Sequence, residues 1–72
     1  MTNHEESLKI RRVLVAGTKA AKRGDLKTGV GQYGLAMFLL GRSRFDISEG
    51  SGFQIFHQIG DLERLLFERL RT

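Results

Sequence analysis

The chain has 72 residues, no cysteine and a net charge of +4 at neutral pH. This length supports one small domain over residues 1–72, with a core near the lower limit of independent stability, and the absence of cysteine excludes disulfides and cysteine-based metal sites. Self-association is therefore expected. No apolar run reaches the roughly 18 residues of a membrane span, and the acidic, polar start does not resemble a signal peptide, so we expect a cytoplasmic protein without membrane contact.

The first predicted element is an amphipathic helix over residues 4–23, preceded by a flexible tail at residues 1–4. Thr2 or Asn3 can cap this helix, and an acidic residue three positions later completes a capping box. Gly24 follows at the place of a left-handed C-terminal cap. Apolar and small residues recur at helical spacing on one side of the helix: Ile10, Val13, Leu14, Gly17, Ala20 and Ala21.

The basic charge of the chain is concentrated in its first part. Residues 8–27 carry seven lysines and arginines against Asp25 alone, a net +6, whereas acidic and basic residues balance over 42–72. A concentrated basic stripe is the usual electrostatic signature of an acidic-protein or nucleic-acid partner, and a solvated helix face is the alternative. The candidate partner-binding residues are Lys9, Arg12, Lys19, Lys22, Arg23 and Lys27.

A second helix is predicted over residues 26–40, with Gly41 as its C-terminal cap. One apolar stripe at helical spacing makes this the helix that we expect to be most buried: Leu26, Val30, Tyr33, Met37 and Leu40. Each glycine in a helix interior costs about 1 kcal/mol relative to alanine. We therefore expect the glycines here to permit close backbone approach, and the helix-packing candidates are Gly29, Gly31, Tyr33, Gly34 and Ala36.

Residues 29–34 also match the spacing G-x-G-x-x-G, which cradles phosphates in dinucleotide-binding proteins. That turn directly follows a strand and opens a helix, whereas the residues before Gly29 are typical of a helix end. The chain is also too short for the other parts of a kinase that uses a similar glycine loop. We therefore prefer the packing interpretation and expect no cofactor.

The last third of the chain has two interpretations. Residues 45–47 and 53–55 alternate apolar and polar around a glycine-containing loop, which predicts a β-hairpin at about 43–56 and an α+β fold. Alternatively, a loop over 42–51 precedes a long helix from near Phe53, and Asp61 caps a shorter helix if Gly60 interrupts it. Both predict a C-terminal helix, whose candidate oligomer face is Ile59, Leu62, Leu66 and Leu70.

Residues that could support catalysis are few. His57 and Asp61 are four positions apart and could act as a base and its orienting acid, but no cysteine is present and no serine is placed as a nucleophile. His4 and His57 without cysteine do not form a typical structural zinc site. We expect a protein without enzymatic activity, metal or cofactor.

The segment around the first interhelical turn resembles a known family of helical repeats. Residues 20–26 have the sequence Ala-Ala-Lys-Arg-Gly-Asp-Leu and are followed by Gly29, Tyr33 and Ala36. This pattern is similar to the inner half of a tetratricopeptide-type helical hairpin. The hairpin also resembles a microtubule-interacting-and-trafficking domain, which has three helices. Both resemblances imply a helical bundle that binds short peptide segments in grooves between its helices.

The same segment is similar to a helix-turn-helix. Ala20, Gly24 and Val30 have the spacing of that motif's small residue, turn glycine and buried aliphatic residue. This resemblance implies a nucleic-acid-binding regulator with residues 26–34 as its recognition helix. The side chains available to contact bases would be Lys27, Thr28, Gln32 and Tyr33.

Taken together, these patterns predict a mainly α fold: an antiparallel hairpin of residues 4–23 and 26–40, packed by a C-terminal helix. We expect a self-associating protein-binding module of adaptor or inhibitor type. It would use the basic face of the first helix and the apolar face of the third to engage another protein. Nucleic-acid binding by a helix-turn-helix is the alternative.

Overall fold

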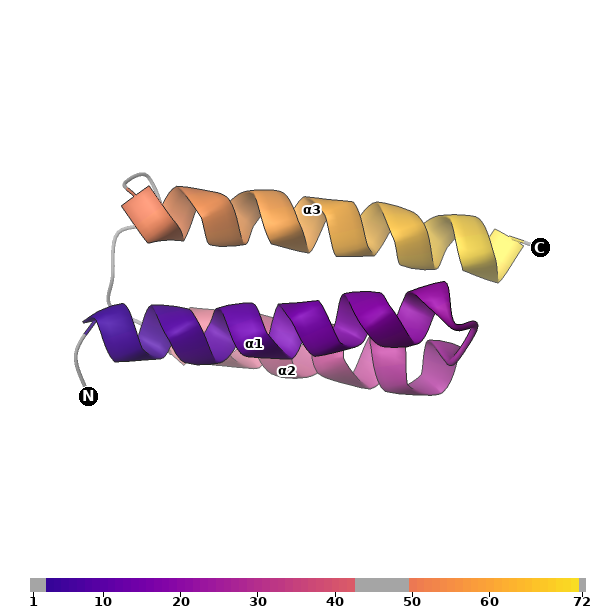
Figure 1. The fold of residues 1–72 in the computed structure, drawn as a ribbon, viewed down its shortest axis with the longest axis horizontal. Coiled ribbons are helices and arrows are strands. Elements are labelled where there is room, and N and C mark those ends of the chain that lie inside the picture. Colours follow the sequence, from indigo (N-terminus) through magenta and orange to yellow (C-terminus); the bar gives the residue numbers. More distant parts are fainter. Residues whose placement is uncertain (1–2, 43–49, 72) are drawn as a thin grey trace.

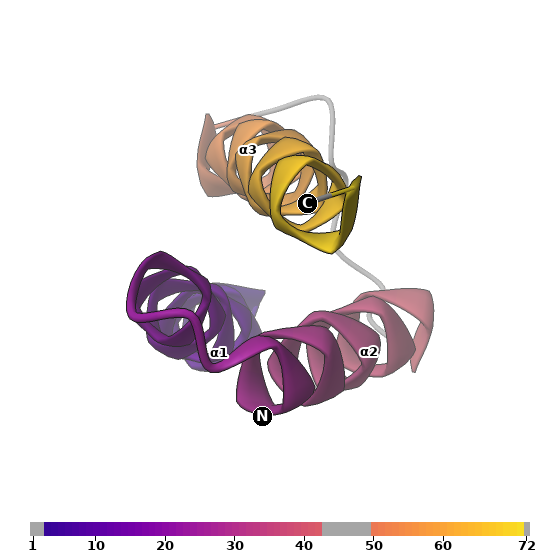
Figure 2. The ribbon, with the colours of Figure 1, turned by 90° about the vertical axis from the view of Figure 1, so that its right-hand side faces the viewer.

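Three helices follow one another along the chain and lie lengthwise beside each other (Figure 1). The computed structural model describes residues 3–42 and 50–71, which form α1 (Asn3–Lys22), α2 (Leu26–Arg42) and α3 (Gly50–Arg71). α1 and α2 form an antiparallel hairpin, and α3 runs in the direction of α1, so that the helices occupy three corners of a triangle when viewed end-on (Figure 2). Within residues 3–42 and 50–71 there is no strand, and the predicted small helical bundle is confirmed.

The turn between α1 and α2 is set by Gly24 and Asp25. Gly24 has a φ of 87°, a left-handed conformation that glycine adopts without steric cost. The N–H of Gly24 donates to the Ala21 carbonyl at 3.0 Å and that of Asp25 to the Ala20 carbonyl at 2.9 Å, which is the Schellman pattern of a helix end. The Asp25 carboxylate accepts a hydrogen bond from the N–H of Thr28 at 3.2 Å and so caps α2. The predicted left-handed cap at Gly24 is confirmed.

The other helix ends differ from the sequence-based boundaries. α1 begins at Asn3, so residues 3 and 4 of the predicted tail belong to the helix, while residues 1 and 2 lie outside the described part. α2 continues to Arg42, so Gly41 lies inside the helix and does not cap it. The end of α1 is tied to α3, because Nη2 of Arg69 donates to the Lys22 carbonyl at 3.2 Å.

The β-hairpin interpretation is wrong where the structure tests it. Residues 53–55, the second predicted strand, lie inside α3, and residues 45–47 lie outside the described residues. The physical reason is periodicity: Ile55 is fully buried and continues the stripe of Ile59, Leu62 and Leu66 at helical spacing. Gly60 does not interrupt α3, so the condition for a helix cap at Asp61 is not met.

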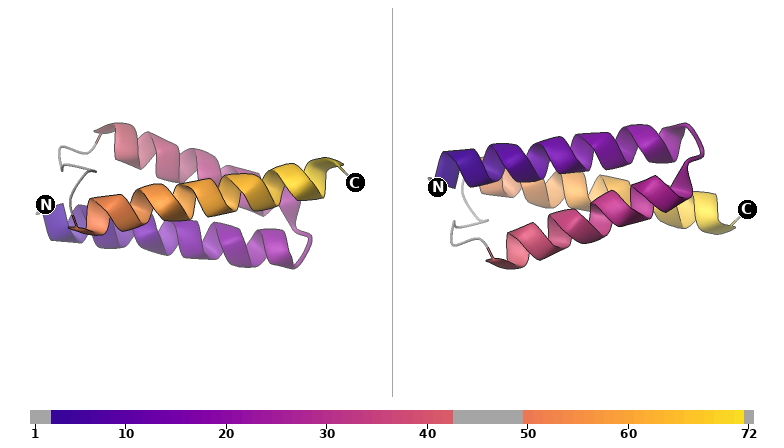
Figure 3. Two further views of the ribbon diagram at one scale, coloured as in Figure 1. Left: turned by 90° about the horizontal axis from the view of Figure 1, so that it is seen from above. Right: turned by 90° about the horizontal axis from the view of Figure 1, so that it is seen from below.

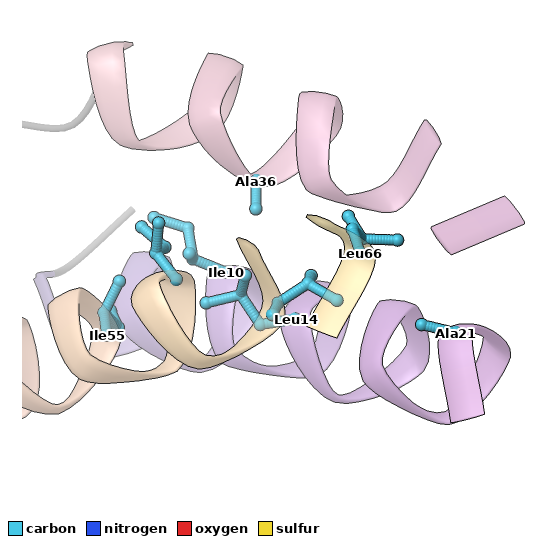
Figure 4. Close-up of a cluster of buried hydrophobic side chains, with 8 residues drawn as sticks. Ile10, Leu14, Ala21, Ala36, Ile55 and Leu66 are labelled. Atoms are coloured by element: carbon cyan, nitrogen blue, oxygen red, sulfur yellow. The ribbon is translucent and has the colours of Figure 1, made fainter. Parts of the chain in front are cut away.

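The fully buried large side chains come from α1 and α3, whereas α2 contributes buried small residues and the partly buried side chains of Leu26, Tyr33, Leu39 and Leu40. Ile10 and Leu14 of α1 meet Ile55 and Leu62 of α3, and all four are fully buried. Figure 4 shows Ile55 and Ile10 toward one end of the core and Leu14 nearer its middle, with Ala36 of α2 above them. Viewed from below, α1 and α2 diverge away from their turn (Figure 3).

The narrow end of the hairpin depends on two glycines that face each other. A Cβ atom on Gly17 would lie 3.0 Å from Cβ of Gln32, 3.0 Å from Cδ2 of Leu62 and 3.6 Å from the Gly29 carbonyl oxygen. A Cβ on Gly29 would lie 3.0 Å from Cδ2 of Leu66 and 3.5 Å from the Gly17 carbonyl oxygen. α1 and α2 therefore approach closely where both lack side chains.

This close approach rotates α2 relative to the predicted face. Gly29 and Ala36 point inward and are buried, whereas Val30 and Met37 of the expected buried stripe are 46 % and 42 % exposed. α2 is thus not the most buried helix: its buried residues are Gly29 and Ala36, and Leu26, Tyr33 and Leu40 of the expected stripe are partly buried against the core. Around Gly31 and Gly34 nothing lies within 4 Å of an added Cβ, so packing within this chain does not explain these two glycines.

Candidate partner-binding surfaces

The basic residues singled out in the sequence are all exposed, but they do not form one surface. Lys9, Arg12 and Lys19 share the outward strip of α1, and Arg23 continues it in the turn. Lys22 lies at the side of α1 that faces α3. Lys27 belongs to the first turn of α2 and lies outside the strip.

Beside this strip, two adjoining open hollows lie along α1, with α3 as their other border. The first, of about 440 Å³, is lined by Leu8, Arg11, Arg12, Val15, Ala16, Lys19 and Gln58. The second, of about 300 Å³, is lined by Leu14, Val15, Thr18, Lys19, Lys22, Gln58 and Asp61. Because Val15, Lys19 and Gln58 line both, the hollows form one continuous depression, which we call the basic groove.

The groove combines an apolar floor with a positive rim. Leu8, Val15 and Ala16 provide the apolar side chains, and the cationic ones are Arg11, Arg12, Lys19 and Lys22. Asp61 is the one acidic residue among the lining residues of the two hollows. Low-dielectric walls beside clustered like charges strengthen the local field, so the groove favours a ligand that is both apolar and acidic.

Gln58 lies at the junction of the two hollows and carries an unsatisfied group. Its Oε1 atom is buried and has no hydrogen-bond partner within the described residues. A buried acceptor without a partner costs about 1–3 kcal/mol. Rotation of this amide toward a donor on a bound ligand would recover part of that cost.

Several residues of the basic groove were not predicted from the sequence. Arg11 entered only the charge count, and Leu8, Val15 and Gln58 were not considered as binding residues. A signal was present, because Leu8 and Val15 are seven residues apart and lie off the core stripe of Ile10 and Leu14. Apolar residues seven apart mark a second helical stripe beside the core.

A second surface lies where α2 meets α3. The hydroxyl of Tyr33 donates to Oε2 of Glu63 at 2.7 Å, so the strips of α2 and α3 that contain these residues run side by side. Neighbours at helical spacing on both strips are exposed apolar side chains, which together we call the apolar face: Val30, Met37, Phe56, Phe67 and Leu70.

The hydrogen bond at the centre of this face changes the acidity of the tyrosine. Donation to the Glu63 carboxylate, followed by partial burial and the nearby negative charge, raises the pKa of Tyr33 above its ordinary value of 10.0. The phenol therefore stays protonated, and can keep donating to Glu63, to a higher pH than an ordinary tyrosine would.

The expected oligomer face on the third helix needs correction. Ile59, Leu62 and Leu66 are buried in the core of this chain, and only Leu70 of the four is exposed. They cannot bind a second molecule while they fill the core. The exposed stripe is rotated to Phe56, Gly60, Glu63, Phe67 and Leu70, a pattern that spacing could have shown.

Of the two candidate catalytic residues, Asp61 lines the second hollow of the basic groove, whereas His57 is not among the residues that line either hollow. His57 and Asp61 are exposed on α3. Among residues 3–42 and 50–71, no cluster of three or more histidines and carboxylates is placed to hold a metal ion. The described helices also include none with the length and apolar character needed to cross a membrane.

The residues suggested to read bases are partly engaged within the fold. Lys27 and Thr28 are exposed, whereas Gln32 and Tyr33 are half-buried and Tyr33 is bonded to Glu63. α1 and α2 lie antiparallel and side by side (Figure 3), whereas the two helices of a helix-turn-helix cross at about 90–120°.

No protein-family model, curated protein or solved structure matches the chain.

Proposed function

We propose that this protein is a small non-catalytic binding module that engages an acidic, amphipathic helical segment of another protein in the basic groove. The observation that carries the proposal is the composition of the groove: Leu8, Val15 and Ala16 form its floor, while arginines and lysines of α1 form its rim. Helix-in-groove recognition needs an apolar floor for anchoring side chains and charges that fix the ligand's orientation.

The dimensions of the groove suit a helix. α1 supplies lining residues from Leu8 to Lys22, about four helical turns at 5.4 Å per turn. A ligand helix lying along α1 and α3 would convert three helices into a four-helix arrangement. The resemblance to peptide-binding tetratricopeptide-type and microtubule-interacting-and-trafficking hairpins suggests the same mode of binding.

A protein ligand explains the groove better than nucleic acid does. Phosphate backbones need cations but no apolar floor, and reading bases requires side chains free to enter a groove of the duplex. In the described residues, Gln32 and Tyr33 are partly engaged within the bundle. Nucleic-acid binding is therefore an outcome of the test below and not a second proposal.

The experiment measures binding of a designed helical peptide with leucines on one face and glutamates on the other. The control peptide carries glutamine at each glutamate position, which keeps the shape and removes the charge. We expect the acidic peptide to bind at least tenfold more tightly, and its affinity to fall as salt is raised. Binding of a duplex oligonucleotide is measured alongside.

Variants of the protein then locate the site. Lys19→Glu reverses a charge that lines both hollows, and Lys27→Glu makes the same change on α2 outside the groove. The proposal expects a large loss of peptide affinity in Lys19→Glu and a small one in Lys27→Glu. Equal losses would indicate general charge attraction, and tighter binding of the duplex than of the peptide would contradict a protein ligand.

A further inference from the structure

We propose that the apolar face binds a second copy of this chain, so that the protein is a homodimer whose two basic grooves remain open. The candidate face is the set already defined around the Tyr33–Glu63 hydrogen bond: Val30, Met37, Phe56, Phe67 and Leu70. This inference concerns a different surface from the basic groove and goes beyond the proposed function.

The area of the face is what a stable dimer needs. Phe56, Phe67 and Leu70 are at least 60 % exposed, and Val30 and Met37 at least 42 %. Since a whole aromatic side chain covers about 150–250 Å², the five side chains present roughly 400–500 Å² of apolar surface. Two copies would bury about twice that, and with a polar rim of ordinary proportion the interface reaches roughly 1,600 Å², a standard size.

The small core of the monomer also favours self-association, because a dimer would bury additional apolar surface. Four of the larger core side chains are fully buried, and the remaining core contains several alanines. A domain of this size, without disulfides, gains little stability from a single core, and oligomerisation is one of the usual remedies. A second copy is always present at the same concentration as the first.

Charge favours this face over others for self-association. The triangle seen end-on places the junction of α2 and α3 opposite α1 (Figure 2), which carries the basic strip. Two copies joined through the apolar face therefore keep their positive strips far apart. The neighbouring surface of α3 is balanced, with Glu63, Glu68, Arg64 and Arg71 around one open hollow of about 450 Å³.

Gly60 lines this hollow, and its missing side chain leaves space at which the dimer can be tested. Nothing lies within 4 Å of a Cβ added at Gly60, so a larger residue there does not disturb the monomer. A helix face with a missing side chain accepts a projecting side chain from a facing helix. Filling the gap would hold the second copy away.

The experiment is sedimentation equilibrium of the full chain over a range of concentrations, with circular dichroism to check helix content. Phe67→Ser removes a ring that is 67 % exposed from the face. Phe38→Ser removes a ring that is 58 % exposed from another side of α2, where Cζ of Arg42 lies 5.5 Å from the centroid of the Phe38 ring. We expect a dimer for the native chain and for Phe38→Ser. Loss of roughly 100 Å² of apolar contact on each copy should raise the dissociation constant of Phe67→Ser at least about 100-fold.

Gly60→Leu and Gly31→Leu form a second matched pair, since both positions are open in the monomer. Gly60→Leu should yield helical monomers, and Gly31→Leu should remain dimeric. A native chain that stays monomeric at high concentration would overturn the proposal, as would equal effects of the paired variants. Peptide binding is measured on the same samples: a monomeric Phe67→Ser that still binds the acidic peptide separates failure of the dimer from failure of the groove.

Discussion

Adding one methyl group should change stability in opposite directions at two helix glycines. In Gly31→Ala the new Cβ meets nothing within 4 Å, so the change gains the helix-propensity difference of about 1 kcal/mol. In Gly17→Ala the same gain is opposed by contacts of 3.0 Å to Cβ of Gln32 and to Cδ2 of Leu62. The leucine methyl can move, but a Cβ atom moves only with the backbone of α2.

The size of the stability difference between the two variants follows from these contacts. Overpacking of a well-filled core costs typically 1–3 kcal/mol, so about 2 kcal/mol against a gain of about 1 leaves Gly17→Ala less stable by about 1 kcal/mol. The two variants should therefore differ by about 2 kcal/mol, or roughly 10 °C in melting temperature for a domain of this size.

Thermal unfolding followed by far-ultraviolet circular dichroism measures this difference, with both variants and the native chain at one protein concentration. Equal stabilisation of both variants would refute the close crossing of α1 and α2 at Gly17 and Gly29. Destabilisation by Gly31→Ala would show that this open position of α2 is in fact covered.

Three further predictions use other parts of the fold. Since Tyr33 is the only tyrosine, tyrosinate absorbance reports its pKa. This pKa should be raised in the native chain and return toward its ordinary value in Glu63→Leu. The stability that the Tyr33–Glu63 hydrogen bond supplies should be lost as pH rises through the raised pKa. Hydrogen bonds from Thr28 lower the pKa of Asp25, so the stability that the cap of α2 supplies should be lost as pH falls through that lowered pKa. Urea unfolding at a series of pH values measures this loss, and Asp25→Asn should keep the cap but lose the pH dependence. Leu62→Ala should cost about 2–5 kcal/mol because Leu62 is fully buried, close to the whole stability of a small domain, whereas Phe38→Ala should have little effect on urea unfolding.

The helical hairpin could be predicted because its signals are local. Gly24 and Asp25 stop one helix and start the next through backbone hydrogen bonds within a few residues. The start of α3 was harder, since the alternation at residues 53–55 fits a strand as well as a helix. Only the stripe that continues to Ile59 and Leu62 decides between them.

The inward face of α2 was not predictable from hydropathy. The stripe through Val30 and Met37 is more hydrophobic than the one through Gly29 and Ala36. Hydropathy does not indicate how closely two helices approach each other. Close packing against Gly17 selected the smaller residues. The same rotation exposed Val30 and Met37, the two residues that α2 contributes to the apolar face. On α3, Ile59, Leu62 and Leu66 are buried in the core and so are not available to an oligomer interface.

The basic character of α1 was evident from composition, but the groove was not. Its floor requires Val15 and its far wall Gln58, and these residues meet only because α3 lies along α1. Contacts between distant segments cannot be obtained from residue spacing on one helix.

Nuclear magnetic resonance mapping of the acidic amphipathic peptide tests the central claim most directly. The account predicts the largest shift changes at Val15 and Lys19 and at the side-chain amide of Gln58, with Gly31 and Gly34 of α2 unchanged. Changes centred on α2, or no saturable change at any residue, would contradict the basic groove as the binding site.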